Sequence, residues 1–415
     1  MTAPVTPKQR QIVRTGADRI LSDASDLLRN KTVGILTNHT GRLSDGRSII
    51  DAVAESGLCR IKALYGPEHG IAGDTPDGKV VEHVNHPGYG IPVYSLYGRI
   101  HKPTKEMLQG LDLLLCDMQD VGARFYTFIS TIALCLEAAA EQRIPFVILD
   151  RPNPIRGLEY DGPVRVPSLK SFVSWMPLPV THGLTIGELA RLWNEEGWLG
   201  PKDSGLGLQN SGSSRPLKAQ LEVVPLKGWK RSMWYDETGL PWIPPSPNMR
   251  TLSTAVLYPG LCFVEGTSLS EGRGTSSPFQ LVGAPWVDPQ GVLMHLREFD
   301  TPGVLIAAEE FTPREIPGIA SQPKYEGVRC KGIHITVTNR DAVKPVRLGV
   351  AIVAAFKRAY PGQTAFRNRR FDILTGNPNV RHQLERNVPP EEICAGWTED
   401  LEKFGAIRSR YLMYL

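Results

Sequence analysis

Two side chains able to move protons, Glu68 and His69, stand side by side in the sequence GPEHG at residues 66–70. Residues 61–65 before them read as a short strand, and the Gly-Pro pair and closing glycine predict a sharp bend. The bend puts both side chains at the carboxyl end of a strand, where open α/β sheets bind ligands. Shielding from water keeps a glutamic acid protonated and suits it to donate a proton. The alternative is an ordinary surface turn with solvated polar groups.

Two further predicted strands, residues 111–117 and 145–150, also end in polar loops. The carboxyl ends of parallel strands share one sheet edge, so we expect these loops to converge on the first. The guanidinium of Arg124 suits a carboxylate, although Arg124 could instead pair with Asp120, and the turn at 150–154 could serve only to stabilise itself. The candidate ligand-binding residues of these loops are Asp117, Asp120, Arg124, Tyr126 and Asn153.

A third candidate segment, EGTSLSEGRGT at residues 265–275, lies far along the chain and contains Glu265, Glu271 and Arg273. Its three glycines let the backbone approach a ligand closely. Apolar stretches on both sides predict that the segment is anchored at each end. The alternative is an exposed polar loop.

The elements that must position these residues alternate between strand and helix in the first half of the chain. Such alternation predicts a Rossmann-like, mostly parallel α/β sheet, with the long 66–100 connection carrying function. The proline-rich residues 241–247 mark a boundary, giving a catalytic domain at 1–245 and a smaller α+β domain at 246–415 that closes the cleft. The other expected strands are 31–37, 221–226, 303–308 and 332–338; the expected helices are 47–56, 129–141, 251–257, 347–360 and one starting at Thr185; and 200–216 is an exposed loop.

Composition excludes several classes of protein. The 415 residues are 41% hydrophobic and 22% charged, as in globular proteins. The net charge of +4, without basic runs interleaved with aromatics, predicts no nucleic-acid partner. We expect a cytoplasmic protein, since the N-terminus lacks a signal-peptide core and no apolar run is long enough to span a membrane. The sequence favours no particular oligomeric state.

Motif searches leave no cofactor to expect. Six cysteines without a CxxC pair predict neither zinc nor disulfides. A near P-loop at 73–80 ends in Val80 instead of Ser or Thr, and no GxGxxG or GxSxG stands at a strand-to-helix turn. The histidines and carboxylates between Glu68 and His86 could form a metal site, but they lie in a Gly/Pro loop that does not fix their spacing. We expect no metal.

Several blocks together resemble the exo-β-N-acetylmuramidases of the NamZ type. They occur in that family's order and span residues 32–415: GPEHG (66–70), SLYG (95–98), DMQDVGARFYTFISTI (117–132), LDRPNP (149–154), HGLTIGELA (182–190), PSPNM (245–249), EGTSLSEGRGTSSPF (265–279) and GAPW (283–286). The resemblance implies a Rossmann-like domain, a smaller C-terminal domain and an active site in the cleft between them. It implies release of terminal non-reducing β-linked N-acetylmuramic acid from peptidoglycan fragments. One departure is Ser268, where the family often has asparagine.

The resemblance also implies roles for individual residues. Glu68 is the expected general acid, and Glu271 and Arg273 fall in the EGRG block. Glycoside hydrolysis needs a second group, for which Glu265, Glu271, Asp117 and the substrate's own 2-acetamido oxygen stay open. Arg124 and Arg273 are candidates for the lactyl carboxylate of muramic acid. Two alternatives remain: a non-catalytic protein that binds cell-wall fragments, and a metal-dependent hydrolase. The latter would use Glu68, His69 and His83.

Overall fold

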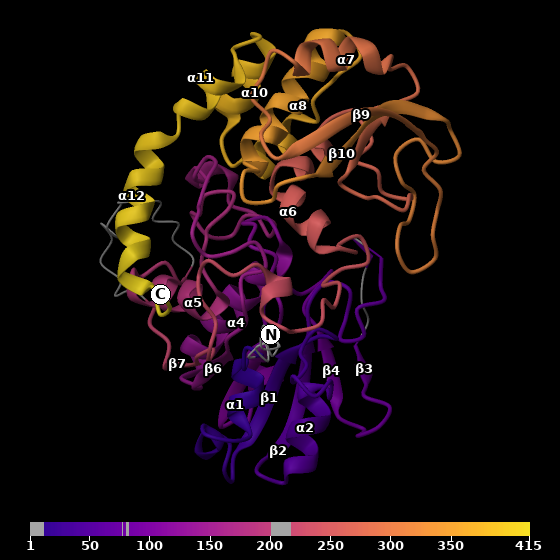
Figure 1. The fold of residues 1–415 in the computed structure, drawn as a ribbon. Helices are drawn as coiled ribbons and strands as arrows, with labels where there is room; N and C mark the ends of the chain where they lie inside the picture. The colour runs from indigo at the N-terminus through magenta and orange to yellow at the C-terminus, as the bar shows by residue number, and fades with distance from the viewer. Residues whose placement is uncertain (1–11, 77, 80–82, 201–216) are drawn as a thin grey trace, which may run out of the picture.

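A seven-stranded sheet forms the centre of the N-terminal domain in the computed structural model, which describes residues 12–76, 78–79, 83–200 and 217–415 (Figure 1). The strand order is β3-β4-β2-β1-β5-β6-β7, and every neighbouring pair is parallel except β3 with β4. The strands are β1 (Thr32–Thr37), β2 (Arg60–Gly66), β3 (Val84–Asn85), β4 (Pro92–Ser95), β5 (Leu113–Asp117), β6 (Phe146–Leu149) and β7 (Leu221–Val224).

Helices cover both faces of this sheet because successive strand residues point to opposite sides. Leu113 and Leu115 of β5 pack with helices α1 and α2, whereas Leu114 and Cys116 pack with α4 and α5. With both faces covered, the carboxyl edge is the place where the sheet can offer polar groups to a ligand. The helices are α1 (Gly16–Ile20), α2 (Ile49–Ser56), α3 (Lys105–Leu108), α4 (Thr127–Gln142) and α5 (Ile186–Glu195).

The C-terminal domain combines a three-stranded antiparallel sheet, ordered β8-β10-β9, with a group of helices. Helices α6 and α8 cross so closely that a Cβ added at Gly260 would meet the Pro345 carbonyl oxygen at 1.8 Å. The elements are α6 (Leu252–Leu261), β8 (Leu281–Ala284), α7 (Pro289–Leu296), β9 (Val304–Phe311), β10 (Cys330–Val337), α8 (Pro345–Ala359), α9 (Asn368–Thr375), α10 (Pro378–Glu385), α11 (Pro390–Ala395) and α12 (Thr398–Arg408).

The chain passes between the domains twice. After α11, helix α12 runs back along the N-terminal domain and brings the C-terminal residues beside α5 (Figure 1). There the backbone N–H of Met413 donates to Glu188 Oε1 (2.8 Å), and the Tyr414 hydroxyl donates to Asp150 Oδ2 (2.5 Å). Residues 408–415, here called the C-terminal tail, therefore belong structurally to the N-terminal domain.

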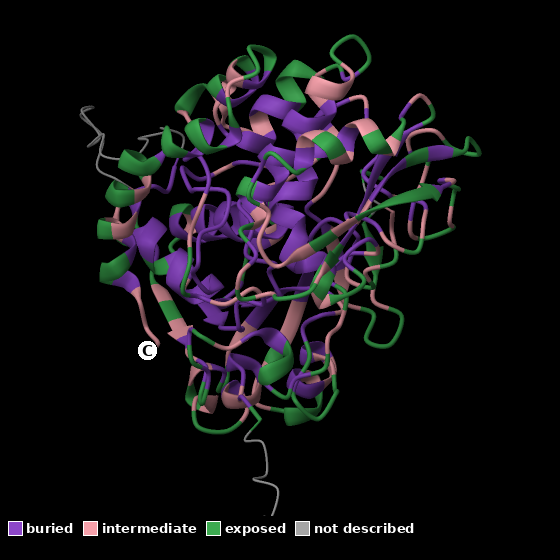
Figure 2. Ribbon diagram, turned by 45° about the horizontal axis from the view of Figure 1, so that its top comes forward, coloured by how far each residue is buried: buried purple, intermediate pink, exposed green. Residues whose placement is uncertain are grey.

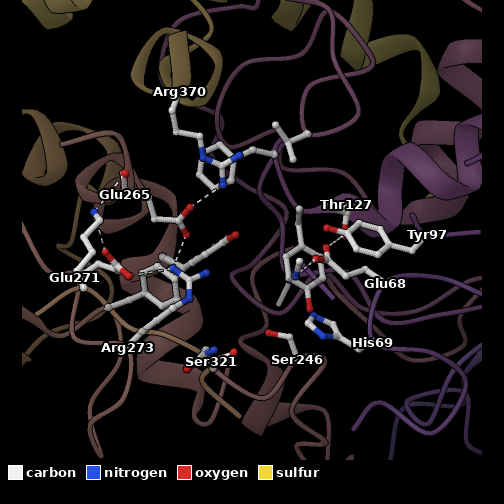
Figure 3. Close-up of a pocket in the computed structure, with 18 of the residues that line it drawn as sticks. Glu68, His69, Tyr97, Thr127, Ser246, Glu265, Glu271, Arg273, Ser321 and Arg370 are labelled. Carbon is white, nitrogen blue, oxygen red and sulfur yellow. Dashed lines mark hydrogen bonds and ion pairs between the residues drawn. The ribbon is translucent and has the colours of Figure 1, made fainter. Parts of the chain in front are cut away.

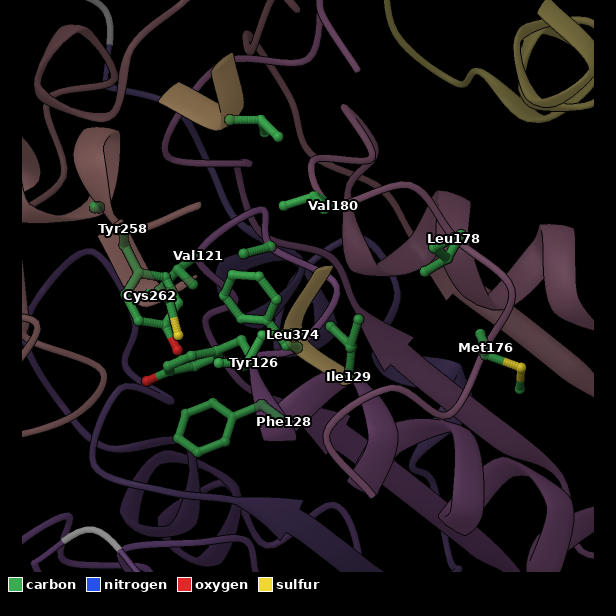
Figure 4. Close-up of a cluster of buried hydrophobic side chains, with 14 of the residues drawn as sticks. Val121, Tyr126, Phe128, Ile129, Met176, Leu178, Val180, Tyr258, Cys262 and Leu374 are labelled. Atoms are coloured by element: carbon green, nitrogen blue, oxygen red, sulfur yellow. The ribbon is translucent and has the colours of Figure 1, made fainter. Parts of the chain in front are cut away.

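The two domains share one hydrophobic core. Buried residues run without a break through the middle of the molecule, and the exposed ones lie on peripheral helices and loops (Figure 2). Figure 4 shows the junction, where Tyr126 and Phe128 of the N-terminal domain lie in one cluster with Tyr258 and Leu374 of the C-terminal domain. None of the helices in the described part of the chain combines the length and apolar character needed to cross a bilayer.

The structure confirms the predicted fold class of a mostly parallel α/β sheet plus a smaller α+β domain. The helix predicted to start at Thr185 is α5, and a capping box between Thr185 and Glu188 opens it. Residues 66–100 were expected to be one connection but contain β3 and β4, which extend the sheet. The predicted loop at 200–216 lies, beyond Gly200, outside the described residues.

Candidate active site

The carboxyl of Glu68 is fixed at both oxygens. β2 ends at Gly66, and the turn that follows closes with a Gly70 N–H to Pro67 carbonyl bond of 3.0 Å. Oε1 of Glu68 accepts from the Gly78 N–H (3.0 Å), and Oε2 accepts from the Thr127 hydroxyl (2.8 Å). Thr127 is the first residue of α4, so the carboxyl lies at the positive end of that helix.

His69 shapes the same turn. Its backbone is left-handed (φ 72°), and its buried ring makes an edge contact with Phe128. Nδ1 lies 2.6 Å from the Thr75 carbonyl oxygen, which only accepts, so Nδ1 carries the proton. The imidazole therefore fastens the loop that follows Glu68.

Glu265 stands in the wall that the C-terminal domain contributes. One carboxylate oxygen accepts from Arg273 and the other from Arg370, both at 2.6 Å. Burial alone would raise the pKa of Glu265, but the two guanidiniums outweigh it and lower the pKa to about 2. Glu265 is thus a permanent anion that holds the two arginines in place.

Glu271 lies beside it and contacts two cations. Its Oε1 is 3.3 Å from Arg273 Nη1, and its Oε2 is 3.1 Å from Lys324 Nζ. The N–H bonds of Lys324 are directed elsewhere, because Nζ lies within 2.8–3.2 Å of four carbonyl oxygens between residues 264 and 269. Lys324 therefore fastens the backbone of the segment that carries both glutamates.

These groups face one another across a cavity of about 670 Å³ between the domains. Figure 3 shows Glu68, His69, Tyr97 and Thr127 on one side, and the cluster of Glu265, Glu271, Arg273 and Arg370 on the other. The volume lies within the range of small-molecule sites. Aromatic rings suited to pack on a sugar also line the cavity: Tyr97, Phe125, Tyr126, Tyr258 and Phe279.

Six of the predicted site residues line the cavity, namely Glu68, His69, Tyr126, Glu265, Glu271 and Arg273. Asp117 does not, because it is fully buried against Arg151, whose Nε and Nη2 donate to its two oxygens at 2.5 and 2.8 Å. Burial raises the pKa of Asp117 despite that arginine. Asp117 is therefore corrected from a catalytic candidate to half of a structural ion pair.

Arg124 is likewise corrected, since it is wholly buried and donates to the carbonyl oxygens of Pro163, Leu178 and Leu374 at 2.6–3.0 Å. Burial lowers its pKa to about 9. Because Leu374 belongs to α9, this side chain joins the two domains instead of meeting a ligand.

Asp120 and Asn153 also stay out of the cavity. Asp120 Oδ2 accepts from the Gly122 N–H (2.7 Å) and lies 3.3 Å from His182 Nε2, so the pairing with Arg124 is wrong as well. Asn153 donates to the Leu184 carbonyl oxygen (3.0 Å) and accepts from the Ile155 N–H (3.1 Å). Asn153 therefore stabilises its own turn and joins it to the segment before α5.

The loop of the metal alternative is described only in part, since residues 77 and 80–82 lie outside the described residues. No cluster of three or more potential metal-binding side chains occurs among the residues that the structure describes. His83 Nδ1 accepts from the Ser95 N–H at 2.9 Å, which joins it to β4.

Several cavity residues were missed from the sequence. Tyr97, Ser246 and Asn248 stand in the SLYG and PSPNM blocks, so attention to those blocks could have found them. Lys324, Arg367 and Arg370 carry no motif signal, because only the folding of the C-terminal domain brings them beside residues 265–273.

The covered parallel sheet, the smaller second domain and the carboxylates on both walls of the cavity form an arrangement suited to glycoside hydrolysis, which needs acidic groups flanking a sugar. Comparison with known families identifies the class further. The chain belongs to the exo-β-N-acetylmuramidase NamZ family: residues 33–253 match its N-terminal domain and residues 256–414 its C-terminal domain. The resemblance inferred from the sequence blocks is confirmed.

Individual relatives agree with this family. The peptidoglycan β-N-acetylmuramidase NamZ of Bacillus subtilis (strain 168) is 40% identical over 403 residues, covering 97% of this chain and 91% of that protein. A DUF1343 family crystal structure from Bacteroides fragilis NCTC 9343 superposes with a TM-score of 0.86 at 32% identity, covering 99% of this chain and 100% of that one. A second from the same organism has a TM-score of 0.74, also at 32% identity, covering 97% and 99%.

Proposed function

We propose that this chain is an exo-acting glycosidase that releases terminal β-linked N-acetylmuramic acid from the non-reducing ends of peptidoglycan fragments, with Glu68 as general acid. Family membership and the named Bacillus subtilis relative support the reaction. The observation that supports Glu68 as the general acid is its lack of a cationic partner. Among the described carboxylates that line the cavity, Glu68 alone makes no ion pair with lysine or arginine.

The two partners of Glu68 determine which oxygen carries the proton. The Gly78 N–H can only donate, so Oε1 stays an acceptor. The Thr127 hydroxyl can donate to an ionised Oε2 or accept from a protonated one. The transferable proton therefore resides on Oε2, which passes it to the glycosidic oxygen as the bond to C1 breaks.

Glu271 is the second catalytic group in this proposal. Asp117 is enclosed with Arg151 outside the cavity, and both carboxylate oxygens of Glu265 are occupied by Arg273 and Arg370 at 2.6 Å. Glu271 and the acetamido oxygen of the substrate remain. The first-formed anomer, followed by NMR, separates the mechanisms: α-muramic acid indicates a water activated by Glu271, and β-muramic acid indicates double displacement. If the product is β-muramic acid, Glu271→Gln identifies the nucleophile. Turnover is lost if the nucleophile is the Glu271 carboxylate, and it stays largely intact if the nucleophile is the acetamido oxygen of the substrate.

Replacing the proposed acid gives the direct test. Glu68→Gln keeps the shape of the side chain but offers no acidic proton, so we expect at least a hundredfold loss of kcat on the disaccharide muramic acid–glucosamine, whose sugar leaving group must be protonated as it departs. Glu106→Gln on the exposed α3 is the matched control and should leave turnover unchanged. Normal turnover by a folded Glu68→Gln variant, as judged by circular dichroism, would remove Glu68 from this role.

Two rival functions are separated by the same assay. A non-catalytic binding protein would retain the disaccharide muramic acid–glucosamine without releasing product over hours. A metal-dependent hydrolase would lose activity when treated with a chelator, whereas the proposed mechanism predicts that activity stays unchanged. A disaccharide ending in non-reducing glucosamine should not be cleaved.

We also propose that the protein works in the cytoplasm on muropeptide fragments. All six cysteines are free and five of them are buried, a pattern compatible with a reducing compartment. Fractionation of cells that express the full-length natural protein, with activity recovered outside the cytoplasm, would contradict this location.

A further inference from the structure

The C-terminal wall of the cavity carries more positive than negative charge. Its formal cations are Arg273, Lys324, Arg367 and Arg370, against the two carboxylates Glu265 and Glu271. A pocket for an uncharged sugar has no need of this surplus. A pocket for a sugar that carries its own carboxylate does.

The ion pairs show where the surplus charge lies. Arg273 contacts both glutamates, Arg370 contacts Glu265 and Lys324 contacts Glu271. Arg367 is the one cation of the cavity lining for which the described residues provide no carboxylate partner. Its guanidinium is therefore the group that a ligand anion could pair with at no cost to an existing ion pair.

The backbone of Arg367 is held firmly although its side chain is exposed. It precedes α9, and its N–H donates to the Gly266 carbonyl oxygen at 2.7 Å. The preceding residue, Phe366, bridges to Thr267. These bonds join Arg367 to the segment that carries Glu265 and Glu271, and its side chain lines the same cavity as Glu68.

We infer that Arg367 is the specificity residue that binds the lactyl carboxylate of muramic acid; this rests on the proposed function. When Glu68 protonates the oxygen on C1, the lactyl ether on C3 leaves the sugar ring away from the departing group. Arg367 lines the same cavity as Glu68 and belongs to the C-terminal domain, so its guanidinium is available to pair with that carboxylate. A guanidinium and a carboxylate match in charge and in hydrogen-bond geometry.

The test crosses one substitution with one change in substrate. The substrates are 4-nitrophenyl β-N-acetylmuramide and the same compound with its lactyl carboxylate converted to the uncharged methylamide. Arg367→Met should raise KM for the acid about tenfold to a hundredfold with kcat little changed, since it removes a charge-assisted bond made in both ground and transition states. The same variant should leave the KM of the methylamide unchanged.

Controls keep this outcome specific to Arg367. Arg369→Met removes a neighbouring exposed charge that does not line the cavity and should behave as wild type. Arg367→Lys should restore part of the affinity for the acid. Equal effects of Arg367→Met on both substrates, or none, would overturn the inference while wild-type turnover still upheld the proposed function. Failure of the wild type to cleave either muramide would instead refute the proposed function.

Discussion

At the residue scale, Thr127 is the partner that lets Glu68 gain and lose a proton in place. Its hydroxyl is 2.8 Å from Glu68 Oε2 and belongs to the first turn of α4. Since the hydroxyl can reverse its direction, it serves both the protonated and the ionised carboxyl. Thr127 is therefore a positioning residue that acts through Glu68.

Removing that hydroxyl should alter catalysis more than binding. Thr127→Val keeps the shape of the side chain but deprives the ionised carboxylate of a donor. We expect kcat to fall roughly tenfold or more, with KM little changed, and the alkaline limb of the pH–rate profile to move to higher pH. Thr127→Ser should restore both the rate and the profile. A Thr127→Val profile that overlays the wild type would show that the hydroxyl only supports the fold.

The sequence predicted those site residues whose ionisable side chains stand in a tight turn or a glycine-rich segment. Glu68 and His69 follow a strand directly, and Glu265, Glu271 and Arg273 share one glycine-rich segment. Ligands bind at the carboxyl ends of strands, and this rule predicts where the backbone of a site lies. It does not predict in which direction each side chain points. Asp117 and Arg124 satisfy that rule, yet both point into the protein, where burial gives them fixed partners.

At the element scale, long apolar runs were identified within a few residues. Strands 31–37 and 111–117 became β1 and β5 because both lie in the middle of the sheet with both faces covered. The short strands β3 and β4 were missed, since two to four residues among glycine and proline give no periodic signal. Helices α9 to α12 were missed because their apolar residues meet neighbouring elements that only the tertiary fold supplies.

The contact between β6, α5 and the C-terminal tail should depend on pH. Asp150 follows β6, and burial raises its pKa to about 6 although Tyr414, Gly187 and Thr185 donate to its oxygens. An unfolded aspartate ionises near pH ~3.9. The native state thus holds an extra proton between roughly pH 4 and 6, and stability from this group is complete below that window and declines as pH rises through it.

Removing the tyrosine hydroxyl should steepen that decline. Tyr414→Phe deprives the ionised Asp150 of a donor and leaves the Leu226 N–H without its acceptor. We expect a loss of about 1–3 kcal/mol in unfolding free energy, larger at pH 7.5 than at pH 4.5, because a hydrogen bond to a charged acceptor is the stronger one. Thermal melts of both proteins at the two pH values measure this. A difference in Tm that is constant or shrinks with pH would contradict it.

At the scale of the whole molecule, the two domains are one structural unit. The core cluster in Figure 4 spans both, Arg124 joins α9 to the N-terminal domain, and the tail returns to Asp150. The cavity between the domains is therefore built on a shared core.

This coupling predicts cooperative unfolding. Calorimetry should show a single transition with equal calorimetric and van't Hoff enthalpies, although a chain of 415 residues would ordinarily unfold in steps. Removing residues 411–415 should lower the Tm of that transition, because Glu196 and Asp150 lose the hydroxyl groups of Tyr411 and Tyr414 that donate to them. Two resolved transitions in the intact protein would show that the domains are independent.

The return of the C-terminal tail also bears on how the protein is made. A ribosome releases the central sheet long before it synthesises residues 408–415, because the whole C-terminal domain comes first. At about 5–20 residues per second, this interval lasts on the order of ten seconds. During that time the partners of the tail, Asp150, Glu188 and Gly183, stand without the groups that later bind them. The N-terminal domain, although first to emerge, is thus among the last parts of the nascent chain to be completed.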